Sequence, residues 1–334
     1  MLPVSWATVR LFLHVLGATV WVGGQHENVV RRATAMDVVT GAFGYTGRFI
    51  TRRLLQSASV VRTLTDHPDR PNPFGERVEL APLAFDDRRA LVASLRGVDV
   101  LYNTYWIRFA RGDVTFDRAV RNTRHLVEAA VEAGARGIVH LSIANPASSS
   151  LPYFTGKAQA EQLVVQSSLR YGIVRPTVLF GGGDVLINNI AWLLRRLPVF
   201  AIASSGDYRI RPVHVDDVAA IAVAAGGRDD SVVLDAVGPE TYTFEQLVRL
   251  IAATLGHRPA IVHVPPWVAL ALAAVLGLLV RDVLVTGDEL AGLMAELVVT
   301  DGPATGTVRL SEWLAEHAGE VGREYASELA RHYR

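Results

Sequence analysis

Tyr153 and Lys157 have the side chains and the spacing of a proton-transfer site. They lie four residues apart, and Lys157 is the only lysine of the sequence, in which arginine otherwise supplies the positive charge. On a helix this spacing puts both side chains on one face. A tyrosine hydroxyl is un-ionised near neutral pH, and a neighbouring ammonium favours its phenolate form. The pair could therefore move a proton at a carbonyl or hydroxyl oxygen while a hydride moves at the carbon.

The pair supports two interpretations, and both stay open. A solvated cation can change to arginine at little cost, whereas a site that needs a compact ammonium cannot. Lys157 is then either part of a working site or a relic in a chain that only binds nucleotide. On a helix surface, the exchange Lys157→Arg is expected to change stability little and to remove turnover.

A glycine-rich stretch predicts a phosphate-binding loop. The sequence "VVTGAFGYTGRFI" puts Gly41, Gly44 and Gly47 between an apolar run and a helical pattern. Such glycines permit a tight turn, a close approach of backbone to a pyrophosphate, and close packing of helix on strand. The start of the helix then offers free N–H groups and a partial positive charge to phosphate.

An acidic residue after the next strand pattern indicates the form of the dinucleotide. Asp66 lies 19 residues after Gly47, where a carboxylate accepts from the ribose 2′-hydroxyl and repels a 2′-phosphate. The cofactor is therefore predicted to be NAD or NADP, with NAD preferred. Arg62 and Arg70 lie close in sequence and weaken the preference.

The elements that must position these residues alternate along the chain. Short apolar runs alternate with helical patterns from residue 37 to residue 180, and a further strand pattern follows near residue 232. This order predicts an α/β fold of the Rossmann type, a doubly wound parallel sheet with helices on both faces. The rest predicts a smaller, mainly helical C-terminal lobe. The expected domains are residues 36–180 with 213–238, and a lobe of residues 181–212 and 239–334.

The two ends of the chain are unusually apolar. Residues 1–35 are predicted to be an apolar extension, and an anchor, a docked helix and a segment outside the fold all remain open. The run 265–280 has fourteen apolar residues after its prolines, fewer than the roughly 20 that span a bilayer. It predicts a helix over the substrate pocket or at a homodimer contact. Peripheral membrane contact is expected, if at all, through residues 1–25 or 267–280.

Composition excludes several classes of function. The formal net charge is +0, which argues against a nucleic-acid partner. The sequence has no cysteine, which excludes disulfides and thiolate metal sites and fits a cytoplasmic protein. The histidines show no metal-binding spacing, so no metal is predicted.

Several segments together resemble a known superfamily. The G-x-x-G-x-x-G spacing, the Y-x-x-x-K pair, "VRPTVLFG" at 174–181 and "RPVHVDDVA" at 211–219 resemble short-chain dehydrogenases/reductases of the atypical and extended branches. Within them the chain is similar to NAD-dependent epimerase/dehydratase and NmrA-like proteins and to the nucleotide-binding accessory subunit of respiratory complex I.

The resemblance implies a function and its residues. It implies an NAD(P)-dependent oxidoreductase or epimerase of a small hydroxyl or carbonyl substrate. The alternative is a dinucleotide-binding sensor or an assembly or scaffold protein without turnover. The implied catalytic residues are Ser142, Tyr153 and Lys157. The implied cofactor-binding residues are Gly41, Phe43, Gly44, Tyr45, Thr46, Gly47, Asp66, Asp86 at the end of the third strand, Asn103, Thr104 and Lys157.

Overall fold

The computed structural model describes residues 36–57 and 59–332. The expectations for residues 1–35, including membrane contact through residues 1–25, lie outside these ranges. Within them, no helix is both long and apolar enough to cross a membrane.

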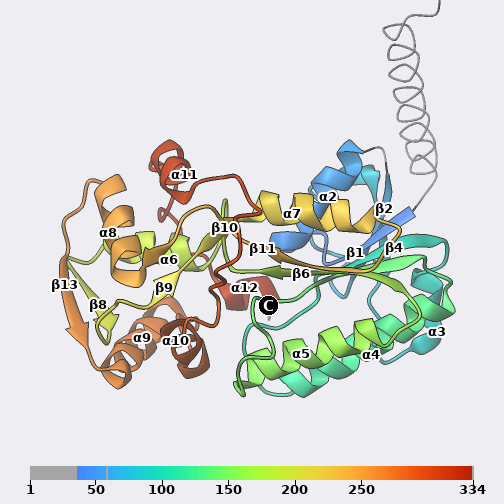
Figure 1. The fold of residues 1–334 in the computed structure, drawn as a ribbon, viewed down its shortest axis with the longest axis horizontal. Coiled ribbons are helices and arrows are strands. Elements are labelled where there is room, and N and C mark those ends of the chain that lie inside the picture. The colour runs from blue at the N-terminus through green and yellow to red at the C-terminus, as the bar shows by residue number, and fades with distance from the viewer. Residues whose placement is uncertain (1–35, 58, 333–334) are drawn as a thin grey trace, which may run out of the picture.

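A seven-stranded sheet forms the larger part of the molecule (Figure 1). Its order is β11-β6-β5-β4-β1-β2-β3, and every neighbouring pair is parallel. The order reverses beside β1, which is the doubly wound arrangement, and the predicted Rossmann-type sheet is confirmed. The strands are β1 (Met36–Thr40), β2 (Val60–Thr65), β3 (Val78–Pro82), β4 (Val98–Asn103), β5 (Gly137–Leu141), β6 (Arg170–Pro176) and β11 (Val232–Ala236).

Helices cover both faces of this sheet, as Figure 1 shows. On one face α2 (Tyr45–Gln56) packs on α7 (Val215–Gly226). On the other lie α3 (Arg88–Ser94), α4 (Phe116–Glu132) and α5 (Pro152–Val165). Each face has its own buried apolar cluster. The central strands β1, β4 and β5 are buried almost throughout, as in a sheet covered on both faces, whereas the edge strands β3 and β11 are more exposed.

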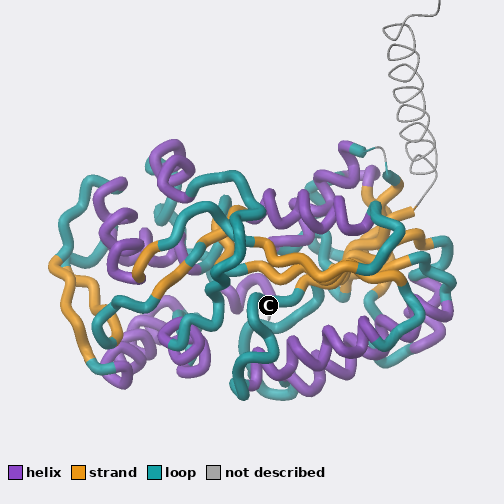
Figure 2. The backbone as a smooth tube through the Cα atoms, in the orientation of Figure 1, coloured by secondary structure: helices purple, strands orange, loops and turns teal. Residues whose placement is uncertain are grey.

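The remainder of the chain forms a smaller lobe that is mainly helical (Figure 2). A third apolar cluster holds it together. Its strands form three pairs: β7 (Val178–Phe180) with β10 (Pro212–His214), β8 (Val199–Ala203) with β13 (Ala260–Val264), and β9 (Arg209–Ile210) with β12 (Tyr242–Thr243). Its helices are α6 (Leu186–Leu194), α8 (Phe244–Thr254), α9 (Pro266–Val280), α10 (Gly287–Met294), α11 (Leu310–His317) and α12 (Glu328–His332).

The chain passes between the two parts more than once. After β7 it enters the lobe, and through α7 and β11 it returns to the large sheet. The last described helix, α12, lies at the junction of the two parts (Figure 1). The domain boundaries given above stay a prediction.

Candidate active site

The glycine loop between β1 and α2 has no room for side chains. A Cβ added at Gly47 would lie 2.2 Å from the Gly41 carbonyl oxygen, and one at Gly44 would lie 3.1 Å from the same atom. Gly41 itself has a φ of +68°, a left-handed conformation that favours glycine. The loop therefore brings bare backbone to the carboxyl end of β1.

The start of α2 fits a phosphate group. Its N-cap is Gly44, which has no side chain to cap the first turn. The N–H groups of Tyr45 and Thr46 in that turn therefore point out of the helix with its partial positive charge. Phe43 to Thr46 are all partly exposed, so a ligand can reach them. This uncapped and accessible helix start fits the pyrophosphate of a dinucleotide.

Thr40 ties the end of β1 to the end of β4. Its hydroxyl accepts hydrogen bonds from the backbone N–H groups of Thr104, at 2.8 Å, and Tyr105, at 3.1 Å. The Thr104 hydroxyl donates in return to the Thr40 carbonyl at 2.5 Å. Thr104 thus lies beside the glycine loop, where the sequence predicted it. Asn103 is fully buried, and its amide contacts Thr40, Tyr105 and His140, so its side chain supports the frame.

Ser142 and Lys157 lie together at the end of β5. Both are buried, and the Lys157 ammonium donates to the carbonyl of Leu141, the residue before Ser142, at 2.7 Å. The Ser142 hydroxyl is enclosed and has no hydrogen-bond partner within the part of the chain that the structure describes. A buried hydroxyl without a partner is uncommon, and here it lies at the edge where a substrate would reach the sheet.

Tyr153 lies on the same helix but in different surroundings. Its ring packs edge-on against Trp106, Phe116 and Phe154. The Trp106 ring also faces the Lys157 ammonium, 4.6 Å from Nζ, and it approaches the helix over Gly156. Among the described residues, no hydrogen bond joins Tyr153 to Lys157 or to Ser142. The structure thus brings Lys157 to Ser142, and both Lys157 and Tyr153 contact Trp106.

The electrostatics of the two residues differ from the sequence-based expectation. Burial raises the pKa of Tyr153, and the negative charge of Glu289 raises it further. An adjacent ammonium would have lowered it. Burial lowers the pKa of Lys157 to about 7, although the charge of Glu161 opposes this. Tyr153 is therefore a neutral proton donor at physiological pH, and Lys157 is close to its titration point.

His140 lies inside this cluster and was not predicted from the sequence. Its Nδ1 is 3.0 Å from the Asn103 amide nitrogen. Burial lowers its pKa to about 3, and the nearby Lys157 charge acts in the same direction. His140 is therefore neutral, and its ring supports the ends of β4 and β5. No sequence pattern marks it, because it lies within an ordinary strand.

The two predicted acidic residues both lie at the surface. Asp66 follows β2, and its side chain is 69% exposed and 3.5 Å from His67. The prediction that Asp86 ends the third strand is wrong, because β3 ends at Pro82. Asp86 instead lies in the turn before α3, where its side chain is 90% exposed and 4.0 Å from Arg118. The apolar residues of "VELAPLAF" continue beyond Pro82, but β3 ends there because its partner strand β2 ends at Thr65, opposite Pro82.

The last described helix reaches the glycine loop. The Arg331 guanidinium carbon lies 5.8 Å from the centre of the Tyr45 ring, and the side chain donates to the Gly183 carbonyl. Arg70 in turn donates to the Arg331 carbonyl at 2.7 Å. Arg48 of α2 contacts the Gly182 carbonyl nearby. These contacts place arginines around the predicted cofactor site, and nothing in the sequence connects Arg331 with a loop almost 300 residues earlier.

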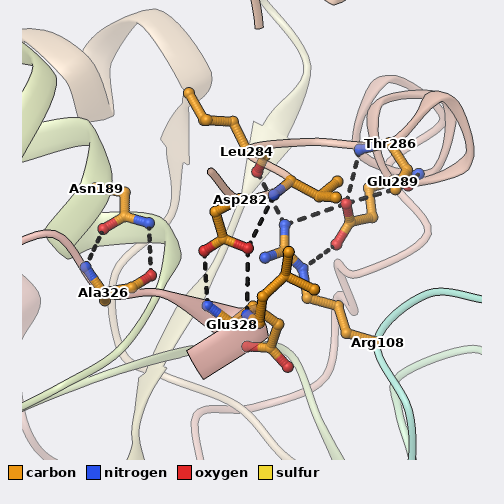
Figure 3. Close-up of polar contacts among 10 residues, drawn as sticks. Arg108, Asn189, Asp282, Leu284, Thr286, Glu289, Ala326 and Glu328 are labelled. Atoms are coloured by element: carbon orange, nitrogen blue, oxygen red, sulfur yellow. Dashed lines mark hydrogen bonds and ion pairs between the residues drawn. The ribbon is translucent and has the colours of Figure 1, made fainter. Parts of the chain in front are cut away.

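An ion pair between Arg108 and Glu289 joins the two parts of the molecule (Figure 3), and both charges act on Tyr153. Arg108, which follows β4, donates to Glu289 of α10 at 2.5 Å and to the Leu284 carbonyl at 2.9 Å. Asp282 accepts from the backbone N–H groups of Glu328 and Leu329 and so holds the start of α12. Within the described ranges, no cluster of three or more His, Asp or Glu side chains could hold a metal.

Comparison with known proteins gives the family. Residues 41–188 match the sequence family described as NAD(P)H-binding. The chain is 30% identical to a ceramide reductase of Caulobacter vibrioides over 238 residues, which cover 70% of this chain and 74% of that one. It is 25% identical to the NADH dehydrogenase [ubiquinone] 1 alpha subcomplex subunit 9 of Arabidopsis thaliana, over 73% of this chain and 64% of that one.

A solved structure supports the fold. The NADPH-dependent quinone oxidoreductase QOR2 of Escherichia coli, complexed with NADPH, superposes with a TM-score of 0.66 at 20% identity, over 85% of this chain and 99% of that one. With the parallel sheet, the glycine loop and the uncapped helix start, these similarities give one conclusion. The chain belongs to the NAD(P)H-binding family of atypical short-chain dehydrogenases/reductases.

Proposed function

We propose that this protein is an NAD(P)-dependent reductase of a carbonyl group on a small, largely apolar substrate. The observation that carries the proposal is the buried Lys157 ammonium held at the end of β5, next to the unpartnered Ser142 hydroxyl. Burying a cation is costly unless it is fully paired, and Lys157 has one hydrogen bond and one aromatic face. Such a site fits a group kept for chemistry rather than for stability.

Each residue has a role in this proposal. The reduced nicotinamide, when bound, supplies a hydride to the carbonyl carbon. Tyr153 donates its hydroxyl proton to the carbonyl oxygen, and its raised pKa suits the acid rather than the base. Ser142 donates a hydrogen bond to the same oxygen. Lys157 stabilises the negative charge left on Tyr153 once Trp106, which now faces the ammonium, has turned aside.

The surroundings favour an apolar substrate. The rings of Trp106, Phe116 and Phe154 pack against Tyr153, and such an aromatic lining suits an apolar substrate. A relative is named a ceramide reductase, which agrees with a carbonyl next to hydrocarbon. A cytoplasmic location and a homodimer stay predictions.

The test is a screen of the full chain with NADH and NADPH against ketones and aldehydes of increasing alkyl length, read by loss of nicotinamide absorbance. We expect turnover to rise with chain length. Tyr153→Phe is expected to lower kcat by about a hundredfold or more, the usual size for a general acid. Tyr171→Phe is the matched control, because Tyr171 lies near the start of β6, away from the site. Equal turnover in both variants would exclude Tyr153 as the acid.

NAD rather than NADP is proposed as the cofactor. Asp66 is exposed at the end of β2, where it can accept from a ribose hydroxyl. Calorimetric titration should give tighter binding of NADH than of NADPH, and Asp66→Ser should reduce the difference between these two affinities. Asp69→Ser, in the same loop, should leave it unchanged. Tighter binding of NADPH by the unaltered protein would refute the assignment.

The second candidate function is dinucleotide binding without turnover. It is favoured by Trp106, whose ring contacts both Lys157 and Tyr153 in this structure. One relative is named as a respiratory complex I subunit. Tight cofactor binding with no turnover of any carbonyl, in both the unaltered chain and Trp106→Ala, would support this function over the first.

A further inference from the structure

Helix α9 exposes an apolar stripe. Trp267, Ala271 and Val275 follow one another at spacings of four, and Leu278 and Leu279 continue the same face. Leu278 and Leu279 are 80% and 76% exposed, and Trp267 is 71% exposed. Of the fifteen residues of α9, Gly277 alone is buried. A helix of a globular protein normally turns its apolar face to the core and a polar face to water, and α9 has no polar face.

The stripe is part of a larger exposed surface. Among the described residues, thirteen large apolar side chains are exposed, and eight of them lie on α9, on β8 or β13, or just before β8. The β8–β13 pair and the residues just before β8 contribute Leu197, Val199 and Val262, and β8 contacts α9. The β8–β13 pair and α9 lie at the end of the molecule away from the large sheet (Figure 1). Exposed apolar side chains gathered on neighbouring elements mark an interaction site, whereas single exposed side chains do not.

We propose that this α9 surface docks on the interfacial region of a lipid bilayer. The fifteen residues extend for about 22 Å, less than the roughly 30 Å hydrocarbon core, so the helix can lie in the interface but cannot span the bilayer. Trp267 at the start of the helix has the amphipathic ring that settles at the headgroup level.

The charges around the surface fit anionic headgroups. Arg258 precedes β13 and Arg281 follows α9, and both are exposed. Within the described part of the chain, neither has an acidic side chain at ion-pair distance. The acidic residue that meets β13, Glu245, is already paired with Arg249 and His263. Unpaired cations next to apolar elements in the chain attract the phosphate groups of anionic lipids.

The surface is connected to the candidate active site through the chain. Leu284, five residues after Leu279, accepts from Arg108 beside Tyr153. The docking itself does not depend on the proposed reductase function.

The experiment is flotation of the full chain with vesicles of phosphatidylcholine, with and without phosphatidylglycerol. We expect the unaltered protein to float, and to float more with the anionic lipid. The double variant Leu278→Ser with Leu279→Ser should lower the partition coefficient by about tenfold or more, because binding scales with buried apolar area. Both side chains are already exposed, so the fold should persist, and unchanged NADH affinity would verify this.

The control removes exposed apolar side chains elsewhere, Val131 at 40% and Val165 at 46% exposure. Val131→Ser with Val165→Ser, on α4 and α5, should float as the unaltered protein does. Arg281→Gln should remove part of the gain from phosphatidylglycerol and leave binding to phosphatidylcholine unchanged. Equal flotation of the α9 variant and the unaltered chain would overturn the proposal, since another segment would then bind the lipid. So would absence of flotation together with a dimer that the α9 substitutions dissociate, because a second copy would then cover the stripe.

Discussion

An ammonium group loses its hydrogen bonds to water when it is buried, and at Lys157 the contacts within the protein replace only some of them. One proton is bonded to the Leu141 carbonyl, and the Trp106 ring faces the charge. Burial consequently lowers the pKa of Lys157 to about 7. The charge of this side chain therefore changes within the physiological range, which an ordinary lysine would not do.

The first prediction is a pH dependence of activity. If the ammonium form of Lys157 supports proton donation, kcat/KM should fall as the pH rises through about 7, the pKa given by its burial. Saturating dinucleotide should move the fall to higher pH, since phosphate charges favour the ammonium. In Lys157→Arg any residual activity should not fall with rising pH in this range, because arginine stays charged. A pH-independent profile of the unaltered enzyme between about pH 6 and 8 would contradict the role.

The second prediction concerns stability. The pKa of Lys157 in the folded protein lies below its ordinary value of 10.5, so the unfolded chain binds more protons between about pH 7 and 10.5. The cost of the buried charge is therefore largest below pH 7 and disappears as the pH rises through this window.

Lys157→Met should accordingly be more stable than the unaltered protein near pH 6, by about 1 kcal/mol or more, after allowing for the unpaired Leu141 carbonyl. The difference should narrow towards pH 10. Urea unfolding at several pH values measures it, and a difference independent of pH would count against the assignment. The structure also corrects the expectation that Lys157→Arg is a mild surface exchange, because Lys157 is only 3% exposed and the larger guanidinium must displace Trp106.

At the scale of elements, the loop between β1 and α2 depends on the absence of side chains. The third prediction is that Gly47→Ala lowers stability by about 1–3 kcal/mol and abolishes dinucleotide binding, because its Cβ would meet backbone atoms that cannot move independently. Gly287→Ala, on α10 with open space around it, is the control and should be neutral or stabilising. Calorimetry of unfolding and of NADH binding gives both values, and normal binding by Gly47→Ala would show that the loop does not hold phosphate.

The elements of the large sheet were predictable because the pattern of each strand and helix lies within its own residues. A strand buried on both faces is an apolar run, and the glycine spacing requires a strand before it and a helix after it. The end of β3 was missed because it is set by the end of its partner strand β2 at Thr65, which the apolar side chains after Pro82 do not reveal.

The site was only partly predictable for a different reason. Ser142, Tyr153 and Lys157 come from one segment, so their spacing carries information. The contact of Trp106 with Lys157 depends on the packing of the loop after β4 on Gly156, and no periodicity in the sequence encodes it. Burial raises the pKa of Tyr153, and Glu289, which raises it further, is 136 residues away in the sequence.

At the scale of the whole molecule, the Arg108–Glu289 pair connects the large sheet with the lobe. The fourth prediction is that Arg108→Gln lowers stability by about 1–3 kcal/mol, since it leaves the half-buried Glu289 carboxylate without its cation. Arg88→Gln is the control, because Arg88 forms more exposed pairs with Glu128 and Glu132 and should change stability by less than about 0.5 kcal/mol. Urea unfolding of the three proteins tests this, and equal midpoints would show that the pair does not hold the two parts together.

The burial of Lys157 has a practical consequence. It is the sole lysine of the sequence and is 3% exposed, so the surface of the described domain offers no ε-amino group to acylating reagents or amine cross-linkers. A lysine whose pKa is lowered to about 7 is nevertheless largely nucleophilic at slightly alkaline pH, once reagent can reach it. The rate of acylation of this amine, followed by mass spectrometry, would therefore measure how often the residues around Lys157 open to solvent, with no probe attached to the protein.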